Sequence, residues 1–373
     1  MKKNRFRYWL HKVIHWEYWP QWLVYAPVTP VYIYYTIKAR TPFFVTAANP
    51  SMENGGYLAE SKFTIHNQLA QQPVAQTILI AQVENYEQVK EQLHTSGISY
   101  PFFCKPDIGG KGRGVEKVEN ENGLRNYHKK SPVNYLIQAA IPFKNEIGVF
   151  YCRLPGEAKG FISGIVGKST MEIKGDGAHT VKELIEAVPR YYYQRHFLFE
   201  KYKAQLHTIP AAGNRFLLSE IGNHARGSLF TDLTHYNNAK LETVIDSISK
   251  AYNTFYFGRY DIKFNSWEEL YEGKNFMIVE LNGSGSEPTH IYDPRKTIWQ
   301  AWKIILQHWK LLYNIAAANH KNGVPYLSFK EGRKLQQIEK EINKKFKQQA
   351  KKTSADNRAA IPKGADQLLS VAG

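Results

Sequence analysis

The sequence predicts a mixed chain of the α/β (α+β) class, with both helices and strands. Short apolar runs typical of strands alternate with segments of helical periodicity from about residue 58 onward. The composition is 43% hydrophobic and 22% charged, which is globular and argues against disorder. A length of 373 residues is enough for two domains, each with its own core.

The predicted elements follow one another from residue 77. Residues 77–82 are expected to form a strand, and residues 84–97 a helix that ends at Gly97. After a Gly-Asp-Gly turn, Thr180 and Glu183 have the spacing of a capping box, which predicts a short helix. Further strands are expected at 101–106, 115–118, 134–141, 146–154, near 257–264 and near 276–282, and further helices at 121–130 and about 237–254.

Two more helices are predicted near the C-terminus. Apolar residues recur at helical spacing from Ile298 to Leu312 and again from Leu335 to Phe346. The tail has no such periodicity and is expected to be disordered. The predicted organisation is an aromatic, basic N-terminal region (1–60), an N-terminal lobe (61–100), a main domain (101–295), C-terminal helices (296–352) and a disordered tail (353–373).

The net charge of +16 is concentrated at the two ends of the chain. Residues 1–22 have a net charge of +4 and residues 330–352 one of +6, so the centre is mildly basic. The sequence has no zinc-finger, helix-turn-helix or RNA-recognition signature. We therefore expect no nucleic-acid partner and interpret the basic ends as solvated faces or as neighbours of an anionic surface.

The two cysteines, Cys104 and Cys152, lie in apolar runs without the spacing of metal ligands. This pattern predicts buried thiols in a reducing compartment and no disulfide framework. We therefore expect a cytoplasmic protein.

The N-terminal segment 16–41 is rich in aromatic residues, and four of the eight tryptophans lie in residues 1–22. Pro20, Pro27 and Pro30 interrupt it, so it lacks the roughly 20 consecutive apolar residues of a membrane-spanning helix. Two interpretations remain open. The first is a buried or inter-subunit hydrophobic surface, the latter in a homodimer. The second is peripheral contact with an anionic membrane, at its inner face, through Trp and Tyr beside basic residues.

A glycine-rich stretch, FCKPDIGGKGRGVEKV (103–118), lies between two predicted strands. It is neither a Walker A motif nor a Rossmann fingerprint, because its spacing differs and a strand follows it. A glycine loop between antiparallel strands can offer backbone N–H groups to phosphates, and Lys105 would add a positive charge. The alternative is an ordinary flexible hairpin tip. The candidate loop residues are Gly109, Gly110, Gly112 and Gly114.

Two later strands carry polar side chains on one face each. In RYDIKF (259–264), alternation places Arg259, Asp261 and Lys263 together, and in IVELNG (278–283) it places Glu280 with Asn282. Buried carboxylates need partners. Oxygen ligands on adjacent strands suit Mg²⁺, with Mn²⁺ as the alternative, because these ions take few protein ligands. The other interpretation is a structural ion pair with one of the two cationic side chains.

The order of these features, Lys-Pro with a glycine loop and then R-x-D and E-x-N, resembles the ATP-grasp superfamily. It is most similar in style to D-alanine–D-alanine ligase and to the ATP-grasp part of cyanophycin synthetase. The resemblance covers roughly residues 60–295. It implies two lobes that clasp ATP between antiparallel sheets, with the ATP-grasp domain at 101–295.

The resemblance also implies which residues bind the nucleotide. Lys105 and the four loop glycines would contact the phosphates of ATP, and Lys168 would be a second phosphate lysine. Gln138 falls where the family has an adenine-contacting residue, usually Glu. Glu146 falls where the family has a ribose-binding glutamate.

The remaining matches concern the metal and the reaction. Asp261, Glu280 and Asn282 match the magnesium ligands of the family. Arg259 matches the arginine that steadies the transferred phosphoryl group. The residues from Gly222 to Asp232 would line an acceptor site or form a structural loop, with Arg226, Gly227 and Asp232 as candidates. His224 and His235 lack metal-site spacing.

The function that follows is an ATP- and magnesium-dependent ligase that joins a small-molecule carboxylate to an amine through an acyl phosphate. No nucleophilic side chain is needed, and the sequence contains no G-x-S-x-G elbow. One alternative is an ATP-grasp kinase that phosphorylates a hydroxyl group. Another is a non-catalytic protein that binds the membrane surface through its aromatic and basic ends.

Overall fold

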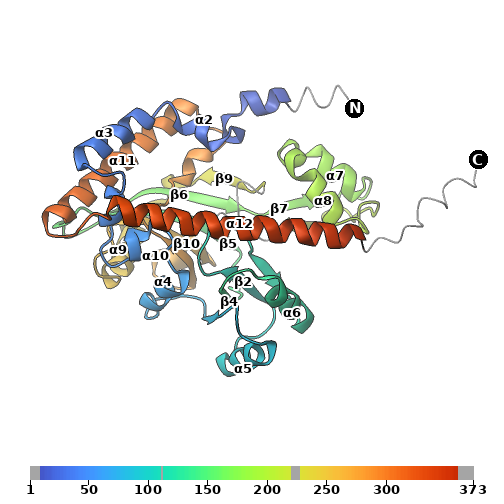
Figure 1. Cartoon of the computed structure of the whole chain (residues 1–373). Helices are drawn as coiled ribbons and strands as arrows, with labels where there is room; N and C mark the ends of the chain where they lie inside the picture. The colour runs from blue at the N-terminus through green and yellow to red at the C-terminus, as the bar shows by residue number, and fades with distance from the viewer. Residues whose placement is uncertain (1–8, 111, 220–226, 360–373) are drawn as a thin grey trace, which may run out of the picture. The chain divides into compact units, whose positions relative to one another are not determined.

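The computed structural model describes residues 9–110, 112–219 and 227–359. It confirms the mixed α/β class with antiparallel sheets (Figure 1). The chain forms two compact units, described separately below. Unit 1 comprises Met1–Ala75 and Ile141–Gly332, and unit 2 comprises Gln76–Ala140 and Arg333–Gly373.

Unit 1 is built on a five-stranded sheet in which the described neighbouring strands are antiparallel. The strands in sheet order are β11 (Phe276–Asn282), β10 (Phe257–Phe264), β5 (Asn145–Cys152), β6 (Phe161–Ser169) and β9 (Leu229–Asp232), and a separate two-stranded sheet pairs β7 (Met171–Lys174) with β8 (Arg215–Ser219). The small sheet is inserted in the chain between the fourth and fifth strands of the large sheet, β6 and β9, and the predicted capping box of Thr180 and Glu183 begins the helix after its first strand.

The helices of unit 1 include the two predicted from helical periodicity and capping, near 239–251 and from residue 298. Two helices precede the sheet in the aromatic N-terminal region, where the prolines lie at or near helix starts and do not interrupt helix interiors. The helices are α2 (Gln21–Tyr25), α3 (Thr29–Ala39), α4 (Lys62–Gln68), α7 (Val181–Ala187), α8 (Arg195–Lys201), α9 (Ala239–Ala251), α10 (Trp267–Tyr271) and α11 (Ile298–Lys321).

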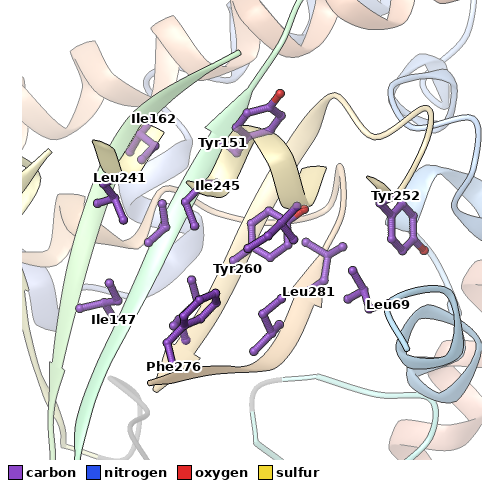
Figure 2. Packing of buried hydrophobic residues seen from close by; sticks show 14 of the residues in the cluster. Leu69, Ile147, Tyr151, Ile162, Leu241, Ile245, Tyr252, Tyr260, Phe276 and Leu281 are labelled. Carbon is purple, nitrogen blue, oxygen red and sulfur yellow. The ribbon is translucent and has the colours of Figure 1, made fainter. Parts of the chain in front are cut away.

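The two faces of the five-stranded sheet differ because side chains alternate along each strand. One face packs on α4, α9 and α10 and forms the largest core of unit 1, part of which Figure 2 shows. Ile147, Val149 and Tyr260 lie on this face, and each is at most 1% exposed. The opposite face is covered at one end by α11 and by residues 44–48. Its other end carries charged side chains, so the packing fixes the face on which the candidate site lies.

Unit 2 has a four-stranded antiparallel sheet with two helices packed on it. The elements agree with the strands and helices predicted between residues 77 and 141. They are β1 (Thr77–Ile80), α5 (Tyr86–Ser96), β2 (Phe102–Pro106), β3 (Glu116–Val118), α6 (Glu121–Lys130) and β4 (Tyr135–Ala139), in the sheet order β1-β4-β2-β3.

A long final helix, α12 (Phe329–Ala359), continues from unit 1 into unit 2. The disordered tail was predicted to begin at residue 353, and this is wrong for residues 353–359, which continue the helix. Ala355, Arg358 and Ala359 are good helix formers, and extending an existing helix by a residue costs less than nucleating a new one, which explains the longer helix. Residues 360–373 lie outside the described part of the chain.

Both cysteines are buried and free, as predicted. Burial raises the pKa of the Cys152 thiol to about 12, so it stays protonated at neutral pH. Within the described ranges, no helix combines the length and the apolar character needed to cross a membrane.

Candidate functional site

Lys105 and Gln138, both predicted to contact the nucleotide, lie side by side in unit 2. Lys105 is 9% exposed, and its Nζ donates a hydrogen bond to Gln138 Oε1 at 3.1 Å. Strand β2 pairs with β4 so that Phe103 faces Gln138, which puts Lys105 and Gln138 on one face of the sheet. Gln138 Nε2 in turn donates to Thr77 Oγ1 at 3.1 Å. The amide therefore holds the lysine ammonium in one position.

The glycine loop joins β2 to β3 as an antiparallel connection, as predicted. Gly112 and Gly114 have φ values of 66° and 68°, which side chains with a Cβ atom rarely adopt. A Cβ atom on Gly114 would also lie 2.8 Å from Pro106 Cγ, so the loop packs back onto the end of β2. The glycines are thus required by the backbone path itself.

Helix α12 contacts this loop within unit 2, which sequence analysis did not predict. Arg113 of the loop donates a hydrogen bond to Asn343 Oδ1. A Cβ atom on Gly114 would come within 2.9 Å of the Phe346 ring, so the ring lies directly against the loop. On the other side, Tyr127 Oη donates to the carbonyl oxygen of Gly114 at 2.7 Å. The loop is therefore held from two elements.

The remaining predicted site residues gather on one face of the five-stranded sheet of unit 1. Arg259 lies opposite Asn282, and Asp261 lies opposite Glu280, so all four side chains share a face. Asp261 also lies opposite Gly148 of β5. A Cβ atom on that glycine would come within 3.1 Å of Asp261 Oδ1 and 3.0 Å of Arg259 Cδ. Glycine therefore leaves room for the charged groups.

A chain of ion pairs runs across three strands of this face. Arg259 Nε donates to Asp261 Oδ1 at 2.9 Å, and Lys168 Nζ lies 2.9 Å from Asp261 Oδ2. The same ammonium lies 3.1 Å from Glu146 Oε1. These side chains are largely buried, so their interactions are weakly screened. Of the structural ion pairs considered for Asp261, the one with Arg259 is present, and a second cation, Lys168, which was not considered, also pairs with it.

Burial and charge act in opposite directions on these groups. Burial would raise the pKa of Asp261, but Arg259 and Lys168 outweigh it and lower the pKa to about 2. Burial would lower the pKa of Lys168, but the carboxylates of Asp261 and Glu146 raise it. Both groups are therefore charged at neutral pH, and this face presents fixed charges of both signs.

The three predicted metal ligands fit Mg²⁺ by their chemistry. Glu280 keeps 30% of its side chain exposed, and its Oε1 is 3.9 Å from Lys62 Nζ, so its oxygens remain accessible. Asn282 Nδ2 is buried without a hydrogen-bond partner among the described residues. No cluster of three or more His, Cys, Asp or Glu suited to a metal occurs in the described ranges. Two carboxylates and an amide would suffice for an ion that keeps several waters.

Sequence analysis missed Glu287 beside this face. Arg259 Nη1 donates to the backbone carbonyl of Glu287 at 3.0 Å. The carboxylate of Glu287 accepts hydrogen bonds from Tyr25 Oη of α2 and from Tyr292 Oη, the latter at 2.8 Å. Tyr25 and Glu287 are 262 residues apart, and no local pattern joins them. Helix α2 thus contributes to the setting of Arg259 through Glu287.

The predicted acceptor residues have a mixed outcome. His224 and Arg226 lie outside the described residues. Asp232 pairs with Lys296 at 2.6 Å, and its backbone N–H donates to Asp293 Oδ2 at 2.7 Å. Gly227 packs against Met171, where a Cβ atom would be 2.8 Å from the sulfur. Asp232 therefore has a structural role in these contacts.

Comparisons with known proteins give structural likenesses. No protein-family model matches the sequence, and no curated protein matches it. Solved structures that the chain is similar to include a D-Ala:D-Ser ligase from Enterococcus faecalis, with a TM-score of 0.39 and 14% identity. They also include a D-alanine–D-alanine ligase from Bacillus anthracis (0.37, 13%) and a bifunctional glutathione synthetase from Pasteurella multocida (0.37, 14%).

The likeness covers 68–70% of this chain. It spans 61% of the D-Ala:D-Ser ligase, 67% of the D-alanine–D-alanine ligase and 35% of the glutathione synthetase.

Proposed function

We propose that the protein is an ATP- and Mg²⁺-dependent ligase that joins a small-molecule carboxylate to an amine through an acyl phosphate. The observation that carries the proposal is the charged face of unit 1. It combines an arginine, a lysine, three carboxylates and an amide, a set of groups suited to holding a metal and a phosphoryl group. The buried lysine of unit 2 supports the same reading, because a desolvated ammonium binds phosphate well.

In the first step, an oxygen of the substrate carboxylate attacks the γ-phosphorus of ATP. The bond to the bridging oxygen breaks, and ADP leaves with that electron pair. Lys105 and the backbone of the glycine loop would bind the phosphates, and Lys168 would offset their charge. Arg259 would donate to the oxygens of the transferred group, where negative charge is spread in the transition state.

Asp261, Glu280 and Asn282 would hold the magnesium ion. When bound, Mg²⁺ would spread the negative charge of the phosphoryl group being transferred. Asp261 is ionised well below neutral pH, so it is ready to act as a ligand. Arg259 and Lys168 would share its carboxylate with the ion.

In the second step, the nitrogen of the amine attacks the acyl carbon, and inorganic phosphate leaves. The new C–N bond forms as the amine loses a proton. Arg259 is held by the Asp261 carboxylate and the Glu287 carbonyl, and from this position its guanidinium would donate to the oxyanion of the tetrahedral intermediate. Pre-orientation of this kind lowers the barrier because little reorganisation is needed.

The experiment is a hydroxylamine trap run with the full chain. ATP, Mg²⁺ and hydroxylamine are supplied with amino acids, dipeptides and other carboxylates in turn. An acyl phosphate reacts with hydroxylamine to give a hydroxamate and phosphate. The proposal expects ADP and hydroxamate in equal amounts with one class of carboxylate. ADP formation with a stable phosphoester and no hydroxamate would instead identify a kinase. If no ADP forms with any of the carboxylates supplied, the proposal that the protein uses ATP is wrong.

A matched pair of variants tests the role of Arg259. Arg259→Met should lower ADP formation by roughly 100-fold, the size of effect seen when one donor to a developing oxyanion is lost. The control is Asp246→Asn, which also removes a charge from an ion pair, with Lys250 at 2.6 Å, on helix α9. The control should keep its activity per folded molecule. Equal losses in both would mean that Arg259 acts through stability alone.

A further inference from the structure

The helices α2 and α3 of unit 1 are apolar on both sides. Their inner side packs against α11, as Figure 1 shows. Tyr35 stacks on Tyr313 with ring centroids 4.6 Å apart, and Tyr32 meets Trp309 at 5.1 Å. Val24 on α2 is fully buried. The inner side is therefore apolar because it packs against α11 in the core of unit 1.

The outer side remains exposed and is equally apolar. Trp22 is 70% exposed, Ile33 50%, Tyr34 56% and Ile37 71%. Within α3 the exposed residues Ile33 and Ile37 are four residues apart and therefore lie on one side of the helix, and exposed Ala26, Pro27 and Pro30 precede them in the chain. The preceding helical residues 9–14 add further exposed apolar side chains: Trp9, Leu10, Val13 and Ile14. Grouped exposed apolar residues of this kind mark an interaction surface.

The charge around this surface has one sign. Residues 9–52 contain a single acidic residue, Glu17, against three basic ones, Lys12, Lys38 and Arg40, which are all exposed. Glu17 is 6% exposed and pairs with Arg190 at 2.7 Å, so it does not offset the outer charge. Helix α11 also has no Asp or Glu, but carries Lys303 and Lys310 on exposed positions. In residues 9–52, which the structure describes, the exposed charged side chains are thus all basic.

We infer that the outer side of α2 and α3, with residues 9–14, binds the surface of an anionic lipid bilayer. Exposed Trp and Tyr are suited to the headgroup region, and isoleucines to the acyl boundary. Each lysine or arginine near an anionic bilayer adds electrostatic attraction. A second copy of the chain fits less well, because a symmetric contact would bring two basic surfaces together. This surface is independent of the proposed ligase activity.

The test is co-sedimentation of the full chain with lipid vesicles. One set contains phosphatidylcholine alone, and the other contains about one third phosphatidylglycerol, an anionic lipid. Binding should occur with the anionic vesicles and weaken between about 0.05 M and about 0.5 M salt. The variant Ile33→Glu/Ile37→Glu should lower the partition coefficient by about tenfold or more, because two charges enter the apolar boundary. Its melting temperature should stay close to that of the wild type, since both side chains are exposed.

The matched control is Val83→Glu/Ile209→Glu, which changes two other exposed aliphatic residues. It should bind anionic vesicles as the wild type does. Equal binding by the Ile33→Glu/Ile37→Glu variant, or no binding to anionic vesicles at low salt, would overturn the inference. A dimer seen by analytical ultracentrifugation and abolished by Ile33→Glu/Ile37→Glu would also overturn it, in favour of a second copy.

Discussion

Nζ of Lys168 lies 2.9 Å from Oδ2 of Asp261, across two strand spacings of the sheet. The contact spans from β6 to β10, and the intervening strand β5 contributes Gly148, which has no side chain to block it. Glu146, at 3.1 Å, is the second carboxylate on the same ammonium. Lys168 therefore joins the predicted ribose-binding carboxylate, Glu146, and the predicted metal-binding carboxylate, Asp261, in one ion-pair network.

Lys168→Met should cost about 3 kcal/mol of unfolding free energy, because it leaves two buried carboxylates with one fewer cation. Mg²⁺ should recover part of this loss by supplying positive charge beside Asp261. The measurement is urea unfolding with and without Mg²⁺. If Lys168→Met is as stable as the wild type, or if Mg²⁺ does not stabilise it, Lys168 and Mg²⁺ do not both compensate the negative charge of Asp261.

Tyr25→Phe should lower kcat about tenfold and leave KM for ATP unchanged. The substitution removes a hydrogen bond to the Glu287 carboxylate, which is worth about 1.5–3 kcal/mol for a charged acceptor, and frees the loop whose carbonyl holds Arg259. Tyr292→Phe should act in the same direction. The control is Tyr35→Phe, whose ring stacks on Tyr313 elsewhere in unit 1. A change in stability with kcat intact would indicate a purely structural role for Tyr25.

Phe346→Ala combined with Asn343→Ala should raise KM for ATP about fivefold, or about 1 kcal/mol in binding. Without these contacts from α12, the glycine loop must be ordered when the phosphates bind, which costs conformational entropy. Steady-state kinetics across ATP concentrations would measure the effect. Lys345→Ala, an exposed neighbour on the same helix, is the control. An unchanged KM in the double variant would show that α12 does not support the loop.

Acid should destabilise the protein between pH 6.5 and about 4 through two buried histidines. Burial lowers the pKa of His290 to about 4 and that of His308 to about 3. In this range the unfolded chain binds protons that the folded chain does not, so stability falls as pH falls, by about 1.4 kcal/mol per pH unit for each histidine. His308→Leu should remove one of these contributions. Denaturant unfolding at several pH values would measure how the unfolding free energy depends on pH. The same pH dependence in the wild type and in His308→Leu would refute the contribution of His308.

Sequence patterns predicted the central strands well. The alternation in RYDIKF and IVELNG placed Arg259 with Asp261 and Glu280 with Asn282, and the register of β10 with β11 joins the two pairs. The strand–loop–strand setting of the glycines was also predicted. In each case the pattern that predicts the structure, an alternation with a period of two or a run of glycines, lies within a few consecutive residues, so the sequence alone was sufficient.

The contacts that complete the site are long-range and could not be predicted in this way. Arg113 and Asn343 are 230 residues apart, and Tyr25 and Glu287 are 262 apart. Strand β6 was missed because Gly164 and Gly167 interrupt its apolar pattern. The packing explains these glycines, since a Cβ atom at Gly164 would lie 2.2 Å from the ring of His290. Such constraints come from neighbours in the fold that no sequence window contains.

The measurement that tests the central claim most directly is Mg²⁺-dependent ADP formation by Asp261→Asn/Glu280→Gln. The control is Asp246→Asn/Glu269→Gln, which makes the same chemical changes on α9 and α10. The account predicts ADP formation by the wild type and the control that depends on Mg²⁺, and none by the site variant, with circular dichroism showing that it is folded. Undiminished Mg²⁺-dependent ADP formation by the folded site variant would contradict the account.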